Sequence, residues 1–100
     1  MIKVKINYDG NVIKGFKVSG HANYDEYGKD IVCASVSTVV ITSINLALKI
    51  DEKSVVVTDK PGLIEANILK RDDVINKIFI NMKDMLVELQ KDYSKNIKIL

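Results

Sequence analysis

Several residue types are scarce in this chain of 100 residues, which has one cysteine, one histidine, one arginine and no tryptophan. A single cysteine excludes an internal disulfide, so the composition does not indicate folding in an oxidising compartment. The first residues, Met1 to Lys5, alternate apolar and charged side chains and do not form the apolar segment of a signal peptide. We therefore expect one domain, residues 1–100, located in the cytoplasm.

A strong positive charge is also missing. The net charge is only +2, and Arg71 is the only arginine among mostly lysine cations. Proteins that bind nucleic acids usually cluster positive charge and use arginine forks to contact phosphates. The scattered lysines are typical of solvated surfaces, so we expect no direct contact with nucleic acid.

No charged residue occurs between Ile31 and Leu48, a length that would span a membrane. The segment nevertheless carries six side chains with hydroxyl or amide groups: Ser35, Ser37, Thr38, Thr42, Ser43 and Asn45. These groups argue against a lone helix facing lipid. We expect instead a buried helix, with part of its surface at a subunit interface.

The periodicity of apolar residues predicts the secondary structure. Alternation predicts strands at about residues 2–7 and 12–18, joined by an Asp9-Gly10 hairpin turn, with a bulge near Lys14-Gly15. A helix should follow from Asp30 to about Lys49. Two more strands, at residues 53–58 and 64–69, should flank a type II turn at Lys60-Pro61-Gly62.

The clearest helix starts at Asp72 or Asp73, and Asp73 forms a favourable pair with Lys77 four residues on. Its predicted apolar stripe has eight members: Val74, Ile75, Ile78, Phe79, Met82, Met85, Leu86 and Leu89. A short strand at residues 97–99 ends the chain. The order ββαββαβ predicts an α+β fold with two helices packed on one mixed or antiparallel sheet.

The single cysteine and the single histidine lie close together in the sequence, at Cys33 and His21. If Asp30 caps the helix, Cys33 is in the first turn, where free N–H groups and the helix dipole favour a thiolate. His21 is then the candidate base, and backbone N–H groups at the helix start are candidate oxyanion donors. Asp30 either caps the helix or orients His21. Ser37, one turn after Cys33, either supports the site or hydrogen-bonds back to the helix.

Each of these residues also has a plainer interpretation. A lone cysteine in an apolar helix is often a small core residue, and a lone histidine in a loop is often exposed and idle. Tyr24 and Tyr27 either pack on the surface or line a pocket for an apolar substrate side chain. One cysteine and one histidine fall short of a zinc ligand set, so we expect no metal and no cofactor.

A longer motif connects these residues. It comprises Gly20-His21-Ala22-Asn23-Tyr24, then Gly28, Asp30-Ile31-Val32-Cys33-Ala34 and Val36-Ser37. This motif closely resembles that of the ribosomal-processing cysteine protease family, Prp. The chain length, the Asp9-Gly10 hairpin and the ββαββαβ order also suit that family.

The resemblance implies a homodimeric, cytoplasmic cysteine endopeptidase with Cys33 as nucleophile, His21 as base, and Asp30 and Ser37 in support. It implies that the substrate is ribosomal large-subunit protein twenty-seven carrying a short N-terminal extension, which is removed by a cut after an aromatic residue. The segment from Gly20 to Lys29 would be a mobile lid, with Gly20 and Gly28 as hinges.

Two other functions remain as alternatives at this point. A non-enzymatic ribosome-associated or RNA-binding domain would use the lysines of the first hairpin and would not depend on Cys33. A thiol redox sensor would oxidise at Cys33, although the chain offers no second cysteine to resolve the oxidised form.

Overall fold

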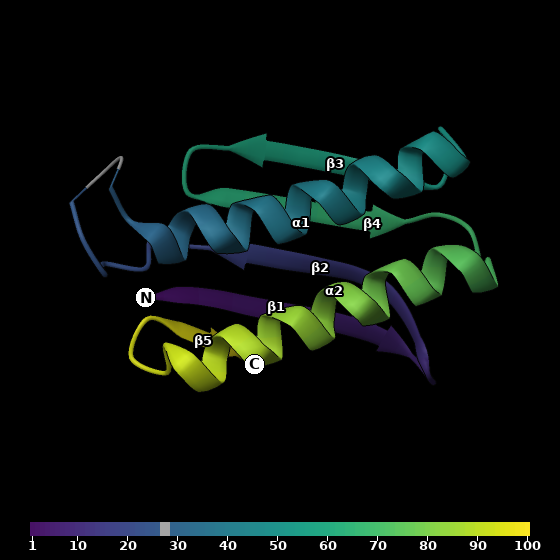
Figure 1. Cartoon of the computed structure of the whole chain (residues 1–100). Coiled ribbons are helices and arrows are strands. Elements are labelled where there is room, and N and C mark those ends of the chain that lie inside the picture. Colours follow the sequence, from purple (N-terminus) through teal and green to yellow (C-terminus); the bar gives the residue numbers. More distant parts are fainter. Residues whose placement is uncertain (27–28) are drawn as a thin grey trace.

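The computed structural model describes residues 1–26 and 29–100, and it has the predicted order of strands and helices. The elements in chain order are β1 (Ile2–Asp9), β2 (Val12–Ser19), α1 (Ile31–Ile50), β3 (Val55–Lys60), β4 (Leu63–Ile68), α2 (Asp73–Asp92) and β5 (Ile97–Ile99). The third and fourth strands lie within two residues of the predicted ranges. The fold is therefore the expected α+β arrangement, ββαββαβ (Figure 1).

The strands form one mixed sheet in the order β3-β4-β2-β1-β5. Three of the four strand pairs are antiparallel, and only β1 and β5 run parallel. The predicted bulge is confirmed. Asn7 pairs with Gly15 and Tyr8 pairs with Ile13, which leaves Lys14 as the extra residue of β2.

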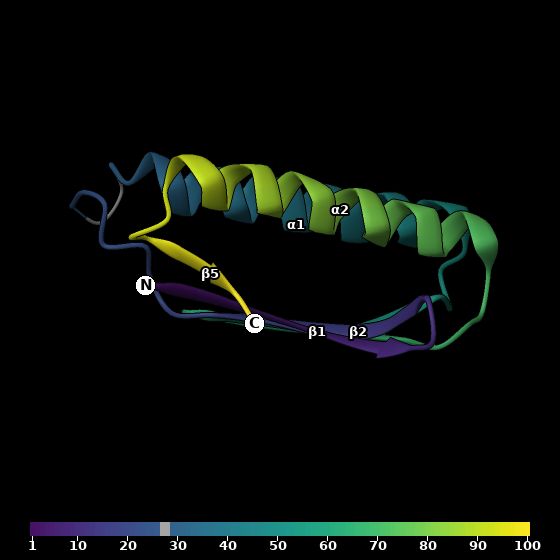
Figure 2. The same cartoon turned by 90° about the horizontal axis from the view of Figure 1, so that it is seen from below.

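Both helices cover the same face of the sheet, as Figure 2 shows from the side. Between the two layers lies a core built from alternate strand residues and from one face of each helix. The rings of Phe16 and Phe79 join the layers, with their centroids 5.4 Å apart. Burial of these apolar side chains outweighs the weak helix propensity of the β-branched residues in α1.

Each helix begins at an aspartate, as predicted. The side chain of Asp30 caps α1, and that of Asp72 caps α2 by accepting the N–H groups of Val74 and Ile75. The predicted apolar stripe of α2 was too wide. Ile75, Phe79, Met82 and Leu86 are buried, but Val74 and Met85 are about half exposed. A single sheet surface covers a narrower arc of a helix than eight apolar residues occupy.

The helix α1 is long and apolar enough to cross a membrane by length and composition alone, a test that a core helix of a soluble protein also passes. Here α1 buries six residues on one face: Val32, Val36, Val40, Ser43, Ile44 and Ala47. The exposed side of α1 carries no charge from Ile31 to Leu48, and Ile31 and Leu46 are among its exposed side chains.

The end of the molecule at the left of Figure 1 brings together segments that are distant in the sequence. The N-terminus of β1, the start of α1, the β3–β4 turn and the α2–β5 turn all lie there. Backbone hydrogen bonds join them: Ile2 N–H donates to Asn96 O at 2.8 Å, and Gly20 N–H donates to Gly62 O at 3.0 Å. The motif around Cys33 lies at this junction.

Candidate active site

A cavity of about 460 Å³ opens beside the first turns of α1. His21, Asp30, Cys33 and Ser37 all line it, although they come from two different segments. The β3–β4 hairpin forms the opposite wall, through Asp59, Lys60, Gly62, Leu63 and Ile64. Ile2 and Val18 contribute apolar surface from the sheet. The structure thus places both candidate reactive residues at one cleft.

Asp30 is a helix cap in this structure. Its Oδ1 accepts the N–H groups of Val32 and Cys33, both at 3.0 Å. Its Oδ2 accepts the N–H of Tyr24 at 2.9 Å and that of Asp25 at 3.4 Å. Both oxygens are therefore occupied by backbone donors, and no hydrogen bond joins Asp30 to His21 within the described residues. The alternative role, as the group that orients His21, does not apply to this conformation.

These contacts decide the charge of Asp30, which is only 9% exposed. Burial raises the pKa of its carboxyl, but the N–H donors of Cys33, Tyr24, Asp25 and Val32 together lower it more. The net pKa therefore lies below the ordinary value. Asp30 is ionised at neutral pH, next to the helix turn that carries Cys33.

The same contacts bear on the expected oxyanion donors, which are backbone N–H groups at the helix start. The N–H groups of Val32 and Cys33 donate to Asp30, as expected for a cap. The donor that reaches the sulfur comes from elsewhere: the N–H of Ala22 donates to Cys33 Sγ at 3.2 Å. This bond crosses 11 residues of sequence and closes the loop onto the start of α1. The sulfur of Cys33 therefore has a backbone hydrogen-bond donor from outside its own helix.

His21 is exposed at the rim of the cleft. Its ring lies against the β3–β4 turn, with Nε2 3.4 Å from the position that a Cβ on Gly62 would occupy. Among the described residues, no hydrogen bond or ion pair joins this ring to Cys33. Gly62 has a positive φ of 74° and no side chain. The His21 ring therefore has room beside the turn.

Gly20 has a φ of 89°, and a Cβ there would lie 2.5 Å from Met1 O. Only glycine fits this backbone next to Met1. Its N–H is also bonded to Gly62 O, so the start of the predicted lid is anchored in this structure. The second predicted hinge, Gly28, and the predicted pocket residue Tyr27 lie outside the described residues. The lid and its hinges stay predictions.

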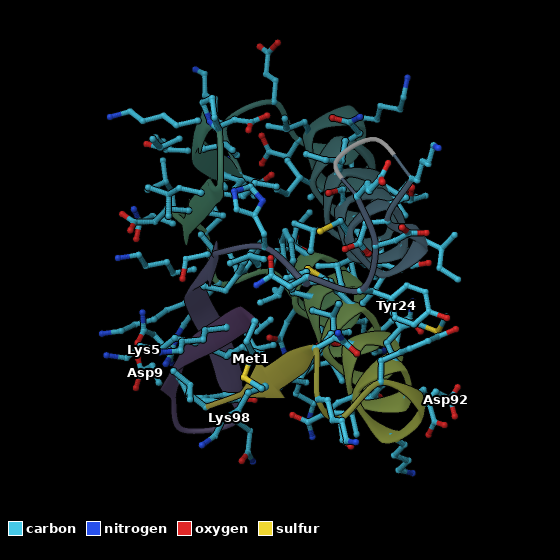
Figure 3. All side chains as sticks on the ribbon, turned by 90° about the vertical axis from the view of Figure 1, so that its left-hand side faces the viewer. Met1, Lys5, Asp9, Tyr24, Asp92 and Lys98 are labelled. Carbon is cyan, nitrogen blue, oxygen red and sulfur yellow. The ribbon has the colours of Figure 1, made fainter. Side chains whose placement is uncertain are left out.

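Ser37 lines the cavity and is an exposed residue. Within the described residues it makes no hydrogen bond back to the helix, whereas Ser35 Oγ donates to Ile31 O at 2.7 Å. Tyr24 is not among the residues that line the cavity. Its ring packs edge-on against Tyr93 at 5.5 Å, and Figure 3 shows it near the C-terminal end of α2. A role for Tyr24 in a substrate pocket stays a prediction.

Two contributors to the site were missed by reasoning from sequence. The backbone N–H of Ala22 and the side chain of Asn96, which donates to Ala22 O at 2.9 Å, both shape the surroundings of Cys33. Ala22 lies within the motif, but its residue type does not indicate that its backbone N–H is a donor to the site. Asn96 is 74 residues away from Ala22 in the chain, and no spacing pattern connects the two.

A cysteine at a capped helix start and a histidine on the same cleft are the components of a cysteine hydrolase. Comparison with known proteins agrees. The sequence model of the family described as cysteine protease Prp matches residues 1–98. The ribosomal processing cysteine protease Prp of Staphylococcus aureus is 30% identical over 103 residues, which cover 98% of this chain and 94% of that protein.

Solved structures give the same result. The chain resembles S. aureus Prp with a covalently linked product peptide at a TM-score of 0.92 and 28% identity, covering 99% of this chain and 97% of that one. For S. aureus Prp with a substrate peptide the TM-score is 0.87 at 27% identity, with 100% and 98% covered. The chain belongs to the cysteine protease Prp family. This membership supports a protease over an RNA-binding domain or a redox sensor.

Proposed function

We propose that this enzyme removes a short N-terminal extension from ribosomal large-subunit protein twenty-seven by cutting after an aromatic residue. The observation that carries the proposal is the cleft shared by Cys33 and His21. The relative from S. aureus is named a ribosomal processing protease and was solved with substrate and product peptides, which supports a peptide as the ligand of this cleft. Apolar side chains from Ile2, Val18 and Ile64 suit an aromatic residue.

In the proposed mechanism, the thiolate of Cys33 attacks the backbone carbonyl carbon of the aromatic residue. His21 accepts the thiol proton, or already shares an ion pair with the thiolate, and then protonates the leaving amine. Water hydrolyses the resulting thioester. The His21 ring must turn from the Gly62 side of the cleft toward Sγ for the proton transfers. Apo sites of this kind often tighten only when substrate binds.

The oxyanion needs a donor other than the capped helix start. The Ala22 N–H already contacts Sγ, so it lies beside the carbonyl that Sγ would attack. Ser37 adds a hydroxyl to the same wall, and Asp30 keeps the first turn of α1 in place. In this proposal the segment from Gly20 to Lys29 closes over the extended peptide. A peptide that does not induce this closure is not cut.

We propose further that the enzyme is a cytoplasmic homodimer without a nucleic-acid partner. The exposed side of α1 supports a dimer, because it carries no charge from Ile31 to Leu48 and charged residues are depleted at the core of protein interfaces. The chain carries no clustered arginine for phosphate contacts, which supports the absence of a nucleic-acid partner.

The decisive experiment is mass spectrometry of the extended ribosomal protein after incubation with the wild-type enzyme or with Cys33→Ala. We expect one defined cut after an aromatic residue with the wild type and none with the variant. Ser35→Ala is a matched control, because Ser35 is on the same helix and bonds only to Ile31 O. Absence of any cut by wild-type protein whose fold is confirmed by circular dichroism would contradict the proposed substrate.

A further inference from the structure

Ala22 is fixed at three points, although it has no reactive group. Its N–H donates to Cys33 Sγ at 3.2 Å, and its carbonyl accepts a hydrogen bond from Asn96 Nδ2 at 2.9 Å. Its methyl group belongs to the core and is 1% exposed. The two residues beside it are constrained less directly, since His21 and Asn23 are both exposed. The N–H and the C=O of Ala22 lie in adjacent peptide planes that meet at its buried Cα, so holding the carbonyl limits how far the N–H can turn.

Asn96 is itself held firmly in the turn between α2 and β5. Its backbone N–H donates to Tyr93 O at 2.8 Å, and its carbonyl accepts the N–H of Ile2 at 2.8 Å. The carboxamide thus projects from a point tied both to the C-terminal end of α2 and to the first residue of β1. A side chain on such a support can fix a loop that contributes little regular structure of its own.

We propose that Asn96 is a positioning residue for Cys33, acting through the backbone of Ala22. By holding the Ala22 carbonyl, Asn96 keeps the Ala22 N–H directed at Sγ, and this hydrogen bond fixes the position of the sulfur at the cleft. The contact does not require His21, which points to the β3–β4 turn in this structure. The two segments that build the site are thereby coupled to the C-terminal end of the fold.

The test uses the fact that Cys33 is the only thiol in the chain. Iodoacetamide therefore reports on this residue alone, with or without any peptide substrate. We expect Asn96→Ala to alkylate about three- to tenfold more slowly than the wild type at neutral pH, because the sulfur loses the N–H donor that holds it in position.

The direction of the change separates positioning from plain destabilisation. A loosened or partly unfolded protein exposes Cys33 and is alkylated faster, not more slowly. Asn76→Ala is a matched control, because Asn76 also joins distant segments through one hydrogen bond, accepting the Ile13 N–H at 2.9 Å. Asn76 is at the opposite end of α2 from the site, so its loss should leave the rate within twofold of the wild type.

The cleavage assay adds a second readout, which rests on the proposed function. There we expect Asn96→Ala to lower kcat with little change in KM, since Asn96 is not among the residues that line the cleft. Asn96→Leu, of similar size but without a donor, should behave in the same way if the alanine variant folds poorly. Alkylation of folded Asn96 variants at or above the wild-type rate would overturn the inference. Slower alkylation in a protein that cuts no peptide would sustain it while refuting the proposed substrate.

Discussion

Asp30 holds the backbone of Tyr24 against the start of α1, its Oδ2 accepting the Tyr24 N–H at 2.9 Å. Since its other oxygen caps the helix at Cys33, one carboxylate connects the loop to the turn that carries Cys33. The N–H donors around it keep the pKa of Asp30 below its ordinary value despite its burial. A group whose pKa is lower in the folded state stabilises the fold only while it is ionised.

The first prediction therefore concerns pH. The contribution of Asp30 should be fully present above about pH 5 and should disappear as the pH falls through its lowered folded pKa, below about pH 4. Asp30→Asn should flatten this part of the profile and lower stability at neutral pH by about 1–2 kcal/mol through the weakened cap. Urea unfolding between pH 3 and 7 measures both effects.

Asp51 provides the control for this experiment. Its pKa is also lowered, chiefly by the hydrogen bond from Lys70, but it lies at the opposite end of α1. Asp51→Asn should flatten the stability profile while leaving the alkylation of Cys33 unchanged, whereas Asp30→Asn should alter both. Equal alkylation by the two variants would show that the cap does not influence the thiol.

The second prediction concerns the room left for His21. Gly62→Ala would introduce a Cβ about van der Waals distance from the His21 ring, on a backbone with positive φ. We expect a loss of about 1–2 kcal/mol in stability from the backbone strain, together with at least a several-fold lower kcat/KM. Denaturant unfolding and peptide cleavage check the two parts separately.

Gly10→Ala is the matched substitution for Gly62. Gly10 has a similar φ of 62°, but a Cβ there would meet nothing within 4 Å. It should therefore show the same strain and normal cleavage. A Gly62→Ala enzyme as active as Gly10→Ala would mean that the turn of the His21 ring toward Sγ does not depend on the space beside Gly62.

The third prediction distinguishes two serines on one helix. Ser37 lines the cleft, whereas Ser35 donates its hydroxyl to Ile31 O. Ser37→Ala should lower kcat/KM by about three- to tenfold, the loss expected for one hydrogen bond in the transition state. Ser35→Ala should stay near the wild-type value. Equal kinetics for the two variants would leave Ser37 without a role in catalysis.

The fourth prediction tests the proposed dimer. Leu46 is 47% exposed on the uncharged face of α1, so Leu46→Glu would place two like charges into a symmetric interface. Light scattering should then find a dimer for the wild type and a monomer for the variant. Val56→Glu, which charges a similarly exposed residue on the edge strand β3, should remain dimeric. A monomeric wild type would remove the proposal.

Much of the fold could be predicted from local sequence patterns, because strands, helix caps and turns depend on neighbouring residues. Alternation gave the strands, Asp30 and Asp72 marked both helix starts, and Gly62 has the positive φ that its turn requires. The bulge at Lys14 followed from a break in the alternation. The predicted apolar stripe of α2 was too wide, because the sequence does not say how wide a surface the sheet will offer.

The sequence by itself limited any thiol chemistry with an imidazole partner to Cys33 and His21, because the chain has one cysteine and one histidine, and it placed Cys33 on a capped first turn. Only the tertiary structure decided which groups surround the sulfur. The Ala22 N–H reaches Sγ, and Asn96 holds Ala22 from the far end of the chain. Backbone donors carry no signature in residue type, and contacts across 74 residues arise only when the sheet and both helices have packed together.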